Sequence, residues 1–292
     1  MKKIKGWEWN ETASLYIQEG LDLSKGIGLG TDKHGDVINK NIYNPRHSRL
    51  YNSFEQAQVF RFQIAVNWAK IHFQDLEKKE DKKRMKVVTD FGCSRSFWYQ
   101  YWRYQGNYFG WPLIYYQGVD INLKRIQEGR ESFVPKKNDR LVYFLGNLSS
   151  QIKMPNLADV IICLEVIEHI DPEKVHTLLN TLYNGLKSTG LLILSSPNPK
   201  KIGTWVWENS PQSHHYEYTF SETKDLLKKS GFKIVDHTGV LPDRNYFKSS
   251  SFPKLRKRLC EIMPAPLVNN FLLLAEKDIQ KKKQWILKAK KI

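Results

Sequence analysis

Three ionisable side chains lie within five residues, directly after a short apolar segment. Glu165, Glu168 and His169 follow residues 159–164 (DVIICL). This segment shows no polar alternation and therefore predicts a strand buried on both faces, as in a parallel sheet. Ligands of open α/β sheets bind beyond the carboxyl ends of the strands. Carboxylates and imidazoles at such an edge are the groups that exchange protons or bind metal ions.

The residues that follow predict the elements that would position this cluster. Asp171 and Pro172 suit the N-cap and the first position of a helix. Apolar residues at helical spacing continue to Leu186, Gly190 is expected to end the helix, and residues 191–194 predict another strand. Together these elements form one strand–helix–strand unit.

The rest of the chain repeats this alternation of strands and helices. Seven strands with intervening helices predict an α/β fold, namely an open, mostly parallel sheet with helices on both faces. One further strand is expected to begin near Lys86. Four others are expected to cover residues 113–119, 140–145, 232–235 and 270–275. The other expected helices cover residues 53–73, 96–104, 123–128 and 221–230.

Length and charge limit the classes of protein to consider. The chain has 292 residues, a formal net charge of +16 and 41% hydrophobic residues. No apolar run is long enough for a transmembrane helix, the basic start lacks a signal-peptide core, and three scattered cysteines suit a cytoplasmic location. The positive charge favours a polyanionic partner such as RNA, although lysine-rich coding bias would give the same composition.

Three regions are expected along the chain. Residues 1–50 form an N-terminal extension, which is either a lid or a disordered arm, and residues 51–278 form the main domain. Residues 279–292 form a basic tail, expected to be a solvated or frayed helix. The aromatic segment 97–116 is expected to close over a bound ligand, to hold a partner or to pack against the extension.

The order of these motifs resembles the class I S-adenosylmethionine-dependent methyltransferases, over roughly residues 53–278. The resemblance implies their Rossmann-like fold. It rests on residues 87–93 (VVTDFGC), Asp120, Gly146-Asn147, the segment 159–169, and the block 214–219 (HHYEYT) ahead of Gly231-Phe232.

The resemblance implies S-adenosylmethionine as cofactor and a set of residues that bind it. Asp90 is expected near the cofactor's amino group, Asp120 at the ribose hydroxyls and Asn147 at the adenine amino group. The expected cofactor-binding residues are Asp90, Gly92, Ser94, Asp120, Ile121, Asn147, Leu148 and Leu164.

One motif departs from the family. Its usual Gly-x-Gly-x-Gly turn here reads Gly92-Cys-Ser94-Arg-Ser96. A serine with positive φ costs about 1 kcal/mol or more. The two serines therefore predict weaker cofactor binding, and they leave open a catalytically silent member of the fold that binds nucleic acid or a partner protein.

The resemblance also implies a hydroxyl acceptor, with the catalytic residues Glu168, His169, His214 and His215. A small molecule or sugar is the expected acceptor. The alternative is a metal-dependent RNA ribose 2′-O-methyltransferase, in which Mg or Mn would be bound by Glu165, Glu168, His169 and His214. A proton-accepting and a purely structural role of the cluster also remain open. Asn198 is expected to line the acceptor pocket, and residues 200–213 to form a lid.

Overall fold

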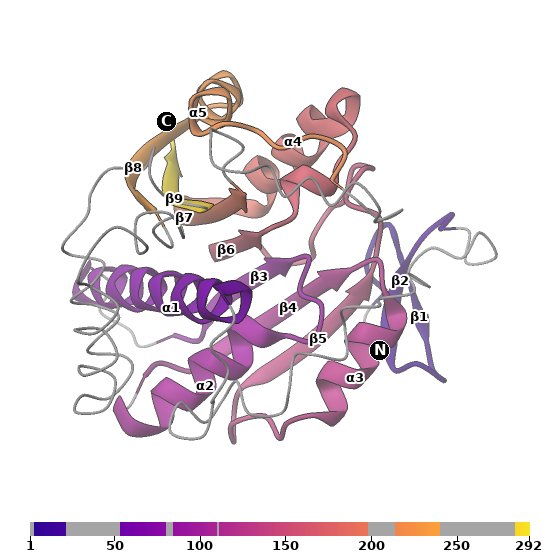
Figure 1. Ribbon diagram of the computed structural model, residues 1–292. Helices are drawn as coiled ribbons and strands as arrows, with labels where there is room; N and C mark the ends of the chain where they lie inside the picture. Colours follow the sequence, from indigo (N-terminus) through magenta and orange to yellow (C-terminus); the bar gives the residue numbers. More distant parts are fainter. Residues whose placement is uncertain (1–2, 22–52, 80–83, 110, 198–213, 240–283) are drawn as a thin grey trace.

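The described residues form one nine-stranded sheet with helices on both faces (Figure 1). The computed structural model describes residues 3–21, 53–79, 84–109, 111–197, 214–239 and 284–292. The strands are β1 (Trp7–Asn10), β2 (Leu15–Gln18), β3 (Lys86–Phe91), β4 (Ile114–Asp120), β5 (Arg140–Leu145), β6 (Ala158–Leu164), β7 (Leu186–Pro197), β8 (Phe232–Gly239) and β9 (Gln284–Lys291). The α-helices are α1 (Ser53–Lys79), α2 (Phe97–Phe109), α3 (Leu123–Glu131), α4 (Val175–Gly185) and α5 (Phe220–Lys229).

The strand order confirms the predicted open α/β sheet. It runs β1-β2-β5-β4-β3-β6-β7-β9-β8, and β3 to β7 are parallel to one another. The chain builds outward from β3 in one direction and from β6 in the other. The adjacent carboxyl ends of β3 and β6 therefore form the switch point at which such sheets bind ligands.

Two strands at one edge were not predicted. The hairpin of β1 and β2 extends the sheet, and β2 pairs in parallel with β5 at Tyr16–Phe144 and Ile17–Leu145. Trp7 supports the hairpin, because its ring meets Phe144 edge-on at 4.7 Å. This part of the N-terminal extension is sheet rather than lid, and residues 22–50 lie outside the described part.

The C-terminal segment is a strand and not the expected helix. Strand β9 lies antiparallel between β7 and β8, and Ile286, Leu287 and Ala289 are buried. Its lysines reach the surface along their alkyl chains, as Lys288 does in pairing with Asp236 at 3.3 Å. The strand expected at 270–275 lies outside the described residues.

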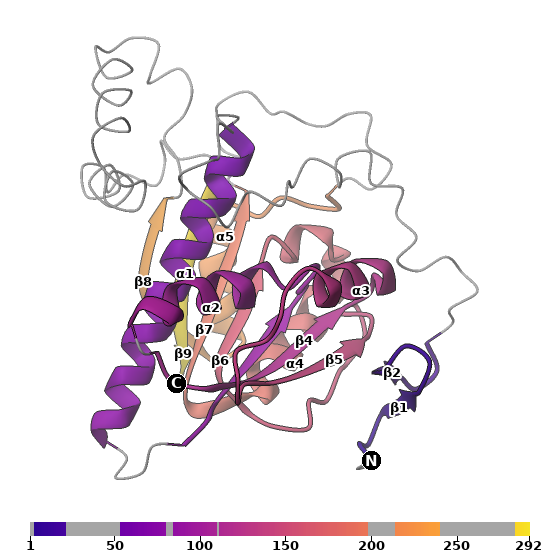
Figure 2. The same cartoon turned by 90° about the horizontal axis from the view of Figure 1, so that it is seen from below.

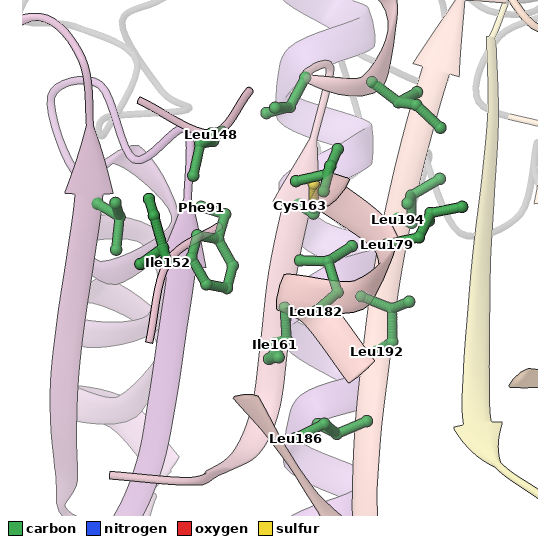
Figure 3. Close-up of a cluster of buried hydrophobic side chains, with 14 of the residues drawn as sticks. Phe91, Leu148, Ile152, Ile161, Cys163, Leu179, Leu182, Leu186, Leu192 and Leu194 are labelled. Carbon is green, nitrogen blue, oxygen red and sulfur yellow. The ribbon is translucent and has the colours of Figure 1, made fainter. Parts of the chain in front are cut away.

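The helices cover the two faces of the sheet as separate layers (Figures 1 and 2). α1, α2 and α3 cover one face, and the aromatic residues of α2 pack on α1, with the Trp102 and Phe73 rings 5.5 Å apart. α4 and α5 cover the other face. Figure 3 shows part of that core, where Leu179 and Leu182 of α4 lie over Ile161 and Leu192.

Two boundaries around α4 differ from the prediction. The helix ends at Gly185, and Gly190 lies inside β7. The Asp171 side chain accepts a hydrogen bond from the Glu173 amide at 3.1 Å and so caps a short 3₁₀ turn, Pro172–Lys174, whereas α4 itself begins at Val175 without a side-chain cap. Among the described helices, none combines the length and the apolar character needed to cross a membrane.

Candidate functional site

The turn after β3 keeps the backbone of a glycine-rich loop although it contains two serines. Gly92, Ser94 and Ser96 have φ values of 76°, 48° and 60°. All three are left-handed, a region in which a residue with a Cβ costs about 1–2 kcal/mol. Gly92 also has no room for a side chain, since a Cβ there would lie 2.4 Å from Val166 Cγ2.

Asp120 links this turn to the end of β4. Its Oδ2 accepts a hydrogen bond from the Ser94 amide at 2.7 Å, and its Oδ1 accepts one from the Asn122 amide at 2.8 Å. Burial raises the pKa of Asp120, although the amide hydrogen bonds oppose the shift. The carboxylate is therefore fixed beside the turn, and its contact with ribose stays a prediction.

Asp90 lies beneath the turn as a second buried carboxyl group. It accepts a hydrogen bond from the Tyr116 hydroxyl at 2.7 Å. Burial, together with the charge of Asp120, raises the pKa of Asp90 to about 7, against the lowering effect of the Tyr116 bond. A cation above the turn would favour its ionised form.

The remaining predicted cofactor residues, Ile121, Asn147, Leu148 and Leu164, lie around this edge, at or just after the ends of β4, β5 and β6. The Asn147 side-chain oxygen accepts the Ser149 amide at 2.9 Å, so it closes a turn after β5. Leu148 is buried in the core on the α4 face, and Leu164 packs at the end of β6 toward the other face. Their contacts with adenine or methionine stay predictions.

Three of the predicted catalytic side chains meet after β6. Single ligand atoms of Glu168, His169 and His214 all lie within 4.8 Å of one another. The two imidazole rings meet edge-on, with centres 4.8 Å apart. Such a set of one carboxylate and two imidazoles can hold a divalent metal or handle a proton.

Glu168 is the buried member of this cluster. Its Oε2 accepts a hydrogen bond from Ser196 Oγ at 3.2 Å, whereas its buried Oε1 has no hydrogen-bond partner among the described residues. Burial, followed by the negative charge of Glu165, raises the pKa of Glu168 well above its usual range. A bound cation or a proton would satisfy this oxygen.

The segment that contains His214 is attached to Glu168 through the main chain. The amides of His215 and Tyr216 donate to the Glu168 carbonyl oxygen at 2.7 and 3.3 Å. His214 Nδ1 lies 2.6 Å from Glu217 Oε1, which orients the ring. The His215 side chain is exposed and lies outside the cluster, so the structure does not support its predicted catalytic role.

His169 lies at the open side of the cluster. Its side chain is exposed in part, yet desolvation by the surrounding protein, followed by the charges of His214 and Arg125, lowers its pKa. The ring is therefore neutral near pH 7, with a nitrogen lone pair that can accept a proton or bind a metal ion.

Glu165 does not join the cluster, which corrects the predicted four-ligand site to three side chains. Its Oε1 accepts a hydrogen bond from Ser195 Oγ at 2.9 Å, and its Oε2 lies 3.2 Å from Arg61 Nη1 of α1. Successive residues of a strand point to opposite faces, so Ser195 and Ser196 hold the two glutamates on opposite sides of β7. Glu165 also adopts φ = 55°, which turns the chain between the two faces.

Several residues of this edge were not recognised from the sequence. Arg61 is buried and fixes Glu165, and Glu217 orients His214. No local signal indicated Arg61, whereas Glu217 lies only three residues after His214, close enough in sequence to be considered as its partner. The predicted pocket residue Asn198 and the predicted lid 200–213 lie outside the described residues.

Comparison with known proteins gives matches over most of the sheet. A family model described as a methyltransferase domain matches residues 62–237. The ubiquinone biosynthesis O-methyltransferase of Rickettsia canadensis (strain McKiel) is 26% identical over 209 residues, covering 65% of this chain and 78% of that protein. The same enzyme of Rickettsia typhi is 25% identical over 210 residues, covering 65% and 76%.

A solved structure supports the fold. Magnesium protoporphyrin IX methyltransferase from Synechocystis PCC 6803, with bound SAH, superposes with a TM-score of 0.50 at 15% identity and covers 87% of this chain and 92% of that one. The family match extends from α1 into β8 and so includes both the turn after β3 and the cluster after β6. The chain therefore belongs to the methyltransferase domain family, and S-adenosylmethionine is its cofactor.

Proposed function

We propose that this methyltransferase transfers the methyl group of S-adenosylmethionine to a hydroxyl oxygen of a small molecule. The observation that carries the proposal is the convergence of Glu168, His169 and His214 at the carboxyl end of β6. A hydroxyl group must lose its proton during transfer, and this cluster offers acceptors for it. The names of the Rickettsia relatives, which are O-methyltransferases, support the same reaction.

The residues of the chain would divide the work between the two strand ends. The sulfonium of the cofactor supplies an activated methyl group. The turn at Gly92–Ser96 and the carboxylate of Asp120 would hold the cofactor. The hydroxyl oxygen would then attack the methyl carbon in line with the bond to sulfur. The hydroxyl proton would pass to the neutral His169 ring, and the sulfonium would leave as a thioether.

We also propose that Glu168 and His214 hold a divalent cation such as Mg²⁺ or Mn²⁺ beside the His169 ring. The buried Glu168 Oε1 lacks a partner among the described residues, as expected of an oxygen reserved for a cation. His214 directs Nδ1 to Glu217, which leaves its Nε2 for the metal. A metal here would bind the acceptor hydroxyl and lower its pKa.

The reaction is tested by methyl transfer from radiolabelled S-adenosylmethionine to matched probes. We expect label in 3,4-dihydroxybenzoate or a methyl glycoside and none in the corresponding aniline. Transfer to the amine alone, or to no hydroxyl although SAH binds, would contradict the proposal. A short RNA in the same assay tests the ribose alternative, which the net charge of +16 favours.

The metal is tested without turnover, by titrating Mn²⁺ and following the signal of the free ion by electron paramagnetic resonance. We expect Glu168→Gln to weaken Mn²⁺ binding by about tenfold or more, and Glu165→Gln to leave it unchanged. Equal binding by both variants and the unmodified protein would place the ion elsewhere.

The two described cysteines, Cys93 and Cys163, are free thiols, which suits the proposed cytoplasmic location.

A further inference from the structure

The cofactor turn contains two residues in a conformation that their side chains disfavour. Ser94 and Ser96 have φ values of 48° and 60°, a left-handed region that a residue with a Cβ disfavours relative to glycine. Such residues keep an unfavourable backbone only where their surroundings hold it. The contacts around each serine therefore identify groups on which the shape of the cofactor site depends.

The two serines are held in different ways. The Ser94 amide is bound by Asp120, but its hydroxyl has no partner among the described residues. Ser96 is fully buried, and its Oγ donates a hydrogen bond to the phenol oxygen of Tyr143 at 3.0 Å. Only Ser96 is thus held through its side chain, and its partner comes from the distant strand β5.

Tyr143 is itself fixed in place. Only 5% of it is exposed, and the guanidinium of Arg130 lies 5.7 Å from the centre of its ring. Burial raises the pKa of the Tyr143 phenol, so the group stays protonated at any pH at which the protein would be studied. It therefore offers Ser96 a neutral oxygen at a constant position.

Helices α2 and α3 fix the middle of the same turn. Glu128 binds the Arg95 side chain at 2.6 and 2.7 Å, and Gln100 donates to the Arg95 carbonyl at 2.6 Å. Gly129 packs directly on the Arg95 backbone, since a Cβ there would lie 2.7 Å from it. With Arg95 clamped, the hydrogen bond from Ser96 to Tyr143 fixes the end of the turn where α2 begins.

We infer that Tyr143 is a positioning residue for S-adenosylmethionine, because its hydrogen bond with Ser96 holds the turn in the conformation that glycine adopts unaided. Tyr143 acts through Ser96 and needs no contact with the cofactor. The inference concerns cofactor binding only, so it does not depend on the identity of the acceptor.

A double-mutant cycle tests this role, with SAH affinity measured by calorimetry. Tyr143→Phe is expected to weaken SAH binding by about tenfold, because the left-handed Ser96 loses its support. In a Ser96→Gly background, the same change is expected to alter the affinity by less than about twofold, since glycine needs no support. Ser96→Ala removes the same hydrogen bond from the other side and is expected to match Tyr143→Phe.

Two further measurements separate positioning from general stability. The melting temperature of each variant is recorded, and Tyr183→Phe on α4 serves as the matched change on the other face of the sheet. Equal weakening of SAH binding by Tyr143→Phe in both backgrounds would overturn the inference, as would a loss below about twofold in the unmodified background. If Tyr143→Phe lowers the melting temperature so far that its SAH affinity cannot be interpreted, the SAH affinities of Ser96→Ala and Ser96→Gly are compared instead. These two variants differ only by the Cβ at position 96.

Discussion

The two strands at the switch point end in sites of different character. After β3, the polar groups already have partners: two main-chain amides bind Asp120 and the Tyr116 hydroxyl binds Asp90. After β6, one oxygen of Glu168 has no partner among the described residues, and two imidazole rings face it. The proposed cofactor side thus has its polar groups satisfied by the protein itself, whereas the proposed acceptor side has an oxygen that a ligand could satisfy.

This difference teaches where function and stability separate. Groups that are already satisfied contribute to the shape of the site, so their loss should change cofactor affinity and folding together. Groups without partners cost stability until a ligand arrives, so their loss should change the reaction more than the fold. The predictions below test this division, in order of decreasing effect.

The largest effect is expected at Glu168. Glu168→Gln should lower the rate of methyl transfer by about 100-fold or more, because the acceptor hydroxyl loses the cation that would lower its pKa. SAH affinity should stay unchanged, since the residue lies on the acceptor side. Steady-state kinetics and calorimetry provide the two readouts, and Glu173→Gln, an exposed glutamate nearby, is the control. A parallel loss of SAH affinity would contradict the proposed separation between a cofactor side after β3 and an acceptor side after β6.

A smaller effect, on binding, is expected at Asp120. Asp120→Asn places an amide group where two main-chain N–H groups need acceptors, which should cost about 2 kcal/mol and weaken SAH binding by about tenfold or more. The melting temperature should fall as well, while the rate at saturating cofactor changes little. Asp225→Asn on the exposed face of α5 is the matched control. A variant that binds SAH normally would show that Asp120 only shapes the turn.

The third prediction concerns pH. Because burial raises the pKa of Asp90 to about 7, the carboxyl group of the free protein is mostly protonated below that pH. The amino group of SAH favours the carboxylate, so binding should release a proton, and affinity should fall by up to about tenfold per pH unit below 7.

The free energy of unfolding is expected to depend on pH in the opposite direction to SAH affinity. A raised carboxyl pKa stabilises the protonated fold, so stability should decline as the pH rises from about 4 to 7 and level off above it. Asp90→Asn should remove the pH dependence of SAH affinity over this interval. If SAH affinity still depends on pH in this variant, the pH dependence arises from another group.

The smallest effect is expected at Ser94. Ser94→Gly should tighten SAH binding by about threefold, because the left-handed backbone no longer opposes a Cβ. Ser94→Ala keeps the Cβ and should bring no gain. If alanine improved affinity as much as glycine, the serine hydroxyl rather than the backbone would be limiting.

Much of the sheet could be predicted because its strands are short apolar segments that end in polar turns. Residues 140–145 coincide with β5, and residues 113–119 fall within one residue of β4. β9 was missed because three of its eight residues are lysines, and lysines can cover a buried strand with their alkyl chains. Pairing between β2 and β5 spans more than a hundred residues and leaves no local pattern.

The site was predictable in its residue types and less so in its geometry. The sequence places Glu165 and Glu168 three residues apart, which suggested a shared ligand. The left-handed backbone at Glu165 and the alternation of Ser195 and Ser196 send the two carboxylates to opposite faces. Such a reversal depends on neighbouring strands, and a single segment cannot reveal it.

The place of β9 between β7 and β8 has a consequence for how the molecule forms. β8 pairs with β9 and not with β7, although β7 and β8 both precede β9 in the chain. A chain synthesised only to residue 283 would therefore lack the strand with which β7 and β8 both pair in the folded protein. We therefore expect the sheet on this side to be completed only after synthesis has passed β9, and until then edges of this kind are open to pairing with other chains.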